Sequence, residues 1–171
     1  EQAYGYYEAR VQLPTEEGFW TAFWLMTDGV LRVGDEGRDG TEIDIYEAPY
    51  ATEDRIHHAL HWDGYGEHHR VAGHNVLVPG IHQGFHTFAL EWNVDEYVFY
   101  IDGVETWRTD AGGVSRVPAY VVLSAEIGQW AGDIRRANLP AQLIVDYVRV
   151  YERIHRIEIE CPALDATVPA D

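Results

Sequence analysis

The sequence predicts an all-β protein, and two observations carry this prediction. The clearest alternation of side chains in the sequence runs over residues 84–93, with three bulky apolar residues on one face: Phe88, Leu90 and Trp92. Asp102-Gly103 is a strong β-hairpin signal between two runs of β-forming residues, 97–101 and 104–109. Together they indicate an antiparallel meander with one buried face, which we expect to be scaffold.

Length and composition limit the number of domains and the kind of partner. The 171 residues suffice for one domain with a substantial core. We expect this domain over residues 1–152, followed by a charged, loosely packed tail over residues 153–171. Twelve basic and 29 acidic residues give a net charge of −17, which disfavours nucleic acid and anionic membranes as partners. The single cysteine, Cys161, excludes a disulfide within the chain.

Two strands are predicted near the start of the chain, over residues 5–13 and 18–26. Trp20 and Trp24 are four residues apart and therefore share a face of the second strand. They could form a platform on which sugar rings stack, or they could belong to the core.

Three carboxylates follow within six residues of a predicted third strand. In a regular strand Glu42 and Asp44 share one face and Glu47 takes the other. One inserted bulge residue near Ile45-Tyr46 changes the count and places Glu47 beside the other two acids. Crowded like charges raise the pKa of at least one carboxyl group, so the set can hold a carboxylate and a carboxylic acid at neutral pH.

Such a pair performs retaining glycoside hydrolysis, in which one carboxylate attacks the anomeric carbon. A second carboxyl group, about 5–5.5 Å away, protonates the leaving oxygen. Under this hypothesis Glu42 and Glu47 are the pair and Asp44 positions the nucleophile. The alternative is a solvated edge strand whose acids serve solubility alone.

Residues 55–62 read as a further strand, and histidines are concentrated around it. His61 is the one that we expect near the acids, whereas His57 and His58 have no assigned role. Tyr65, in the turn-like segment that follows, is a candidate sugar contact. A zinc site is the alternative for the histidines, but their spacing matches no zinc motif.

Two more strands are predicted over residues 119–126 and 142–151. The first is apolar enough to be buried, and Glu126 and Trp130 at its end look like substrate contacts; Glu126 could instead be a structural acid. In the last strand Asp146 interrupts a row of apolar residues, so we expect it to be buried with a cation or several donors.

Six segments, in this order, resemble glycoside hydrolase family 16: residues 4–10, 18–26, 42–47, 84–92, 99–103 and 146–151. The resemblance implies a concanavalin-like jelly-roll β-sandwich of two antiparallel sheets. It implies Glu42 as nucleophile, Asp44 as its assisting acid and Glu47 as acid/base. The bulged acid motif is similar to that of the laminarinase, agarase and carrageenase branches. Members often bind calcium on the convex side through an acid at the position of Asp146.

The chain also departs from the family. Members usually carry some tens of residues of strands before the first matching block, and these strands are missing here. We expect a fragment or a processed chain, whose missing strands are lost or supplied by another chain. The segment around Glu126 and Trp130 resembles galactan-directed relatives more than laminarinases, so the choice between glucan and galactan stays open.

The function that these residues favour is retaining endo-hydrolysis of a β-1,3-glucan, a β-1,3/1,4-glucan or a galactan. We expect substrate contacts from Trp20, Trp24, His61, Tyr65, Glu126 and Trp130. No organic cofactor is implied, a structural calcium at Asp146 is the one metal expected, and we expect a secreted monomer. The alternatives are a non-catalytic carbohydrate-binding module on the same fold and a transglycosylase.

Overall fold

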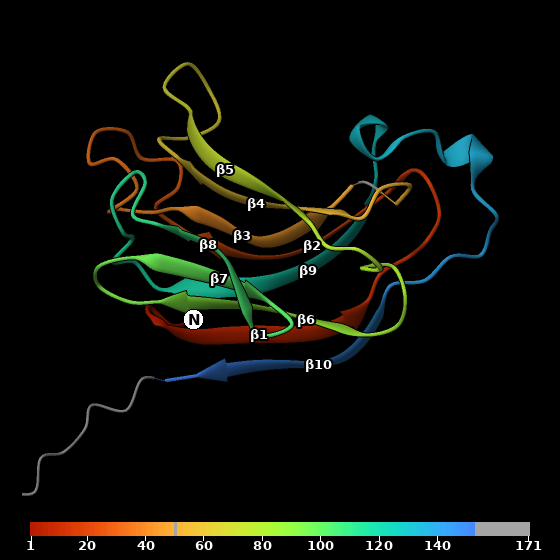
Figure 1. Ribbon diagram of the computed structural model, residues 1–171. Helices are drawn as coiled ribbons and strands as arrows, with labels where there is room; N and C mark the ends of the chain where they lie inside the picture. Colours follow the sequence, from red (N-terminus) through yellow and green to blue (C-terminus); the bar gives the residue numbers. More distant parts are fainter. Residues whose placement is uncertain (50, 153–171) are drawn as a thin grey trace, which may run out of the picture.

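The computed structural model describes residues 1–49 and 51–152, and it consists of two antiparallel sheets packed face to face (Figure 1). The first sheet has the order β5 (Arg70–Leu77), β4 (Arg55–Trp62), β3 (Glu42–Ala48), β2 (Phe19–Thr27) and β9 (Ala119–Ile127). The second has the order β10 (Ile144–Tyr151), β1 (Gly5–Gln12), β6 (His86–Trp92), β7 (Tyr97–Ile101) and β8 (Val104–Thr109). Two short 3₁₀ helices, η1 (Gln129–Ala131) and η2 (Ile134–Arg136), precede β10. The predicted all-β sandwich is confirmed, although β5 was not among the expected strands.

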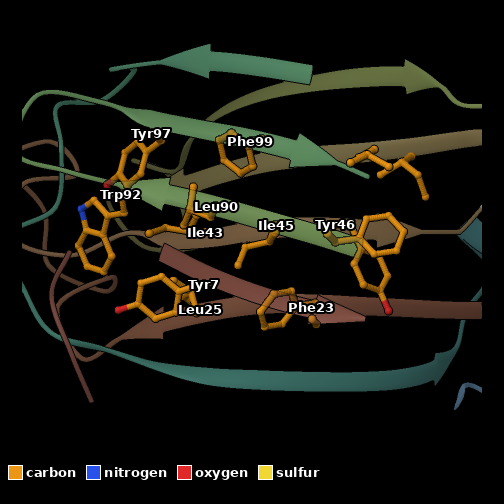
Figure 2. Close-up of a cluster of buried hydrophobic side chains, with 14 of the residues drawn as sticks. Tyr7, Phe23, Leu25, Ile43, Ile45, Tyr46, Leu90, Trp92, Tyr97 and Phe99 are labelled. Carbon is orange, nitrogen blue, oxygen red and sulfur yellow. The ribbon is translucent and has the colours of Figure 1, made fainter. Parts of the chain in front are cut away.

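The core lies between the two sheets and is rich in aromatic rings (Figure 2). The side chains predicted to share the buried face of β6 are at most 1% exposed: Phe88, Leu90 and Trp92. Phe23 and Tyr46 of the first sheet are buried in the same core. The ring of Tyr46 packs against the ring of Phe88, with centroids 4.2 Å apart. Burial of this apolar surface is the main force that holds the sheets together.

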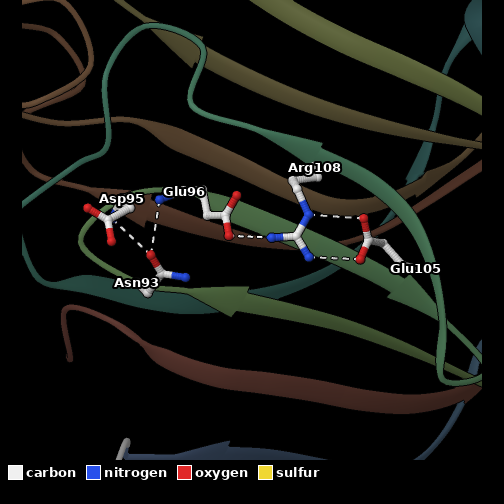
Figure 3. A network of polar contacts seen from close by, with 5 residues as sticks. All are labelled: Asn93, Asp95, Glu96, Glu105 and Arg108. Atoms are coloured by element: carbon white, nitrogen blue, oxygen red, sulfur yellow. Dashed lines mark hydrogen bonds and ion pairs between the residues drawn. The ribbon is translucent and has the colours of Figure 1, made fainter.

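The β6–β7 hairpin is closed by side chains (Figure 3). Asn93 Oδ1 accepts hydrogen bonds from the backbone N–H groups of Asp95 and Glu96, at 2.8 and 3.1 Å. Arg108 on β8 binds Glu105 at 2.9 Å and also binds Glu96. Residues 102 and 103, which join β7 to β8, have φ angles of 50° and 76°, as a two-residue type I′ hairpin turn requires. The predicted meander is therefore confirmed, and its role is structural.

The prediction that residues 119–126 form a buried strand is wrong. β9 ends the first sheet beside β2, and on its other edge Ala119 bridges to Gln2, so among the described residues the rest of that edge has no strand beside it. Tyr120 is 42% exposed and Ile127 is 66% exposed. Apolar composition indicated burial, but a strand at a sheet edge keeps much of its surface in contact with solvent.

The prediction that Asp146 is buried in an apolar row is also wrong. The register of β10 against β1 shifts between Arg10 and Val11, where Arg10 pairs with Tyr147 and Val11 pairs with Val145. This irregularity puts Asp146 on the outer face, where its carboxylate lies 2.6 Å from Arg10 Nη1. A single carboxylate beside a guanidinium does not supply the six to eight oxygens that calcium takes, so these residues do not fit a calcium site.

No helix among the described residues is long and apolar enough to span a membrane. The predicted tail over residues 153–171, with Cys161, lies outside the part of the chain that the structure describes.

Candidate active site

The predicted bulge is present in β3, and it gathers the three acids. Against β4, Asp44 pairs with Ala59 and Glu47 pairs with His57, so two residues of β3 face one residue of β4. The register against β2 shifts at the same place. The side chains of Ile45 and Tyr46 consequently both enter the core, although they are adjacent in sequence. Glu47 is thereby returned to the face of Glu42 and Asp44.

This face forms the floor of a pocket over β2, β3 and β9. Eight residues line it: Trp20, Ala22, Trp24, Glu42, Asp44, Glu47, Ser124 and Glu126. Ala22 lies opposite Glu47 and leaves space above this acid, while Trp24 lies opposite Asp44. The pocket thus brings together the three predicted catalytic acids and three of the six predicted substrate contacts.

Glu47 is 7% exposed, and its surroundings favour the protonated form. Burial, followed by the charge of Asp44, raises the pKa of Glu47 to about 8. Two contacts act in the opposite direction: the charge of His61 and a hydrogen bond in which Trp20 Nε1 donates to Glu47 Oε1 at 3.0 Å. These surroundings favour the protonated form of Glu47 at neutral pH, the form in which a carboxyl group can act as a general acid.

Asp44 is buried beside His61. Burial and the charge of Glu42 raise the pKa of Asp44 well above its usual range. His61 Nε2 lies 3.4 Å from Asp44 Oδ2, and His61 Nδ1 lies 2.9 Å from Nε2 of His69. His61 is therefore placed beside the acids, as predicted, and His69 orients its ring from behind.

Glu42 is partly exposed and is held by a tyrosine from the loop after β4. The hydroxyl of Tyr65 donates a hydrogen bond to Glu42 Oε2. Burial and the neighbouring Glu42 raise the pKa of Tyr65, so this hydroxyl stays protonated and remains a donor at neutral pH. Tyr65, predicted as a sugar contact, contacts the predicted nucleophile Glu42 directly.

The predicted aromatic contacts lie around the pocket. Trp130, in η1, packs edge-on against Trp20 with ring centroids 5.0 Å apart, and it is 41% exposed. Trp24 is half-buried, and its Nε1 donates to Ser124 Oγ at 3.2 Å. Glu126 is exposed at the rim. Such rings beside carboxylates suit a ligand with apolar faces and many hydroxyl groups.

One group of possible metal ligands occurs among residues 1–49 and 51–152. Ligand atoms of Glu42, Asp44 and His61 all lie within 4.8 Å of one another. We assign no metal to them, because acidic groups of this kind are common without one.

Sequence reasoning did not find Ser124, His69 or His58. Ser124 is opposite Ala22 across the β2–β9 pair, and His69 reaches His61 from the end of a loop. Strand alternation could have placed Ser124 on the face of Glu126, but only the fold shows which strand is its neighbour.

Comparison with known proteins agrees with this fold. The chain is 31% identical to a beta-glucanase of Rhodothermus marinus over 165 residues, which cover 86% of this chain and 57% of that protein. It is 28% identical to a keratan-sulfate endo-1,4-beta-galactosidase of Sphingobacterium multivorum, covering 87% of this chain and 37% of that protein. The chain therefore spans little more than half the length of the first relative and a smaller part of the second.

Solved structures show the same architecture. The laminarinase catalytic domain of Thermotoga maritima, in complex with cetyltrimethylammonium bromide, superposes with a TM-score of 0.72 at 28% identity, covering 91% of this chain and 66% of that one. Residues 1–149 match the family described as Glycosyl hydrolases family 16. This match covers most of the chain, and the chain therefore belongs to glycosyl hydrolase family 16.

Proposed function

We propose that this chain hydrolyses internal β-glycosidic bonds of a β-glucan with retention of configuration. One observation carries the proposal: the bulge in β3 brings Glu47, whose pKa is raised to about 8 by burial, into one pocket with a partly exposed Glu42. The names of the relatives, a beta-glucanase and a laminarinase among them, support glucan as the substrate. The galactosidase relative keeps a galactan as the second candidate.

In the first step an Oε atom of Glu42 forms a bond to the anomeric carbon while the glycosidic C–O bond breaks. Glu47 gives its proton to the leaving oxygen, so the departing sugar leaves as a neutral alcohol. Tyr65 holds the Glu42 carboxylate by its hydrogen bond, and this orientation lowers the entropic cost of the attack.

In the second step water attacks the anomeric carbon. Glu47, now ionised, takes a proton from this water as the bond between the anomeric carbon and Glu42 breaks. Glu47 is thereby protonated again and Glu42 is again a carboxylate. His61 Nε2 lies 3.4 Å from Asp44 Oδ2 and would hold the side chain of Asp44 beside the two glutamates during the cycle.

Stacking on Trp20, Trp24 and Trp130 would bind the polysaccharide along the pocket, and Glu126 would accept hydrogen bonds from its hydroxyl groups. The net charge of −17 favours a neutral polymer over a sulfated one. We also propose that the protein acts outside the cell, because such a polymer does not enter cells. We further propose that it acts as a monomer. Detection of the native protein in culture supernatant would test this location.

The test uses laminarin, mixed-linkage glucan, agarose and galactan with the wild-type protein and with Glu42→Gln. We expect short oligosaccharides from at least one glucan and none from the variant, which should still bind that polymer. A 2-fluoro glycosyl fluoride of the matching sugar should attach to Glu42, as read by peptide mass spectrometry. Binding without cleavage or labelling by the wild-type protein would instead establish a carbohydrate-binding module.

A further inference from the structure

The bulge in β3 interrupts the regular pairing between β3 and β4. His58 stands alone opposite Ile45 and Tyr46, since the neighbouring pairs are Asp44 with Ala59 and Glu47 with His57. The side chains of Ile45 and Tyr46 are fully buried. A buried carbonyl oxygen without a partner destabilises the conformation that buries it, so this bulge needs a donor.

The side chain of His58 supplies this donor. Its Nδ1 lies 2.6 Å from the carbonyl oxygen of Ile45, and the side chain is fully buried. A carbonyl oxygen only accepts, so the hydrogen is on Nδ1. Burial lowers the pKa of His58 to about 4, which keeps the ring neutral at neutral pH. Nε2 is then an acceptor, and it lies 2.9 Å from Oγ1 of Thr106, a hydroxyl that also lies 3.2 Å from the carbonyl oxygen of Phe99.

Thr106 belongs to β8 of the opposite sheet, so His58 connects the bulge with the other half of the sandwich. Rings of that sheet also fix the plane of the imidazole. The centroid of Phe99 is 4.9 Å from that of His58, and the ring of Trp107 stacks at 6.5 Å. The position of the Nδ1–H group is thus set by the second sheet rather than by β4 alone.

We propose that His58 is a positioning residue for the hydrolysis, because its bond to the Ile45 carbonyl holds the register that turns Glu47 into the pocket beside Glu42 and Asp44. The residue contacts no substrate and acts through the backbone of β3. The inference rests on the proposed function for its effect on turnover, but the effect on Glu47 is independent of turnover. A histidine that only fills the core would need neither a defined tautomer nor the threonine.

The test compares two variants that differ in which ring nitrogen they replace. In His58→Asn the amide nitrogen takes the place of Nδ1 and can still donate to Ile45, whereas in His58→Gln it takes the place of Nε2. We expect His58→Asn to keep kcat within about fivefold of the wild-type value and His58→Gln to lose about 100-fold, with KM little changed in both. Thr106→Val should lower kcat about tenfold. His86→Gln on β6 is the control, and its kcat should equal that of the wild-type protein.

Two NMR measurements decide the inference without any turnover. In the wild-type protein, ¹⁵N spectra should show the Nδ1–H tautomer of His58 at neutral pH. The ¹³C-labelled carboxyl of Glu47 should titrate near pH 8 in the wild-type protein and His58→Asn, and nearer its ordinary value in His58→Gln. Should the glutamine variant not fold, Thr106→Val removes the hydroxyl that orients the ring, and Glu47 should then titrate below its wild-type value.

An Nε2–H tautomer, or a folded His58→Gln whose Glu47 titrates as in the wild-type protein, would overturn the inference. If the wild-type protein shows the expected NMR behaviour but cleaves no polysaccharide, the proposed function fails and the role of His58 at the bulge stands.

Discussion

Trp20 Nε1 on β2 donates a hydrogen bond to Glu47 Oε1 on β3 at 3.0 Å, and both side chains line the pocket. This bond stabilises the ionised carboxylate and so opposes the burial that raises the pKa of Glu47. The tryptophan therefore has two functions: it offers an apolar face and it limits how weak an acid Glu47 becomes.

Trp20→Phe should move the alkaline limb of the pH profile of kcat/KM upward. A hydrogen bond to a charged group contributes about 1.5–3 kcal/mol, so its loss should raise the pKa of Glu47 by about one or more. The measurement is kcat/KM from pH 5 to 10. Trp24→Phe is the control, because Trp24 donates to Ser124 and not to an acid, and its limb should stay in place. Unchanged limbs in both variants would refute the role of the Trp20 bond.

Glu47→Gln should remove activity but stabilise the protein at alkaline pH. The folded chain keeps a proton on Glu47 up to about pH 8, whereas the unfolded chain releases it near 4.5. The contribution of this proton to the free energy of unfolding is thus fully present below pH 4.5. It is lost as pH rises through 8, by at most roughly 4–5 kcal/mol. Glutamine does not titrate, so the melting temperature of the variant should exceed that of the wild-type protein by about 5–15 °C at pH 9 and match it near pH 4. Glu126→Gln, at the exposed rim, should show no such difference. Parallel melting curves for Glu47→Gln at every pH would contradict the buried acid.

Tyr65→Phe should lower kcat by about 5–20-fold with little change in KM, because one oriented hydrogen bond to the nucleophile, worth about 1–2 kcal/mol, is lost. Steady-state kinetics on a defined oligosaccharide measure both constants. Tyr120→Phe, at an exposed tyrosine of β9, is the matched control. A rise in KM alone would show that Tyr65 binds substrate and does not position Glu42.

His58 should make the protein sensitive to acid. Burial, together with the charges of His74 and His57, lowers the pKa of His58 to about 4. The side chains that face His58 from the other sheet carry no charge: Thr106, Phe99 and Trp107. The unfolded chain takes up the proton near pH 6.5, so stability falls as pH decreases from 6.5 to 4, by about 3 kcal/mol. Urea unfolding at pH 7 and pH 4.5 should show a smaller loss for His58→Asn than for the wild-type protein. Equal losses would show that His58 is accessible to protons in the folded state.

Trp130→Ala should weaken binding of long oligosaccharides by about 3–10-fold and leave kcat unchanged, since an aromatic contact is worth about 0.5–1.5 kcal/mol. Isothermal titration of Glu42→Gln with and without this substitution isolates binding from cleavage. Leu139→Ala, at another exposed apolar side chain, should have no effect. A fall in kcat with unchanged affinity would place Trp130 outside the binding surface.

The sequence by itself determined the fold class and the position of the acids. Alternation over residues 84–93 defined the buried face of β6, and the spacing of Glu42, Asp44 and Glu47 required a bulge if all three were to share a face. These features are local, because strand periodicity and turn chemistry depend on residues within one or two elements.

Only the tertiary structure decided the contacts between distant segments. It placed Asp146 against Arg10, 136 positions away, and Ser124 against Trp24, 100 positions away. It also made β9 an edge strand and brought Thr106 of the opposite sheet to His58. Alternation says which residues share a face, but strand order and register arise from the packing of the whole sandwich, which no local pattern records.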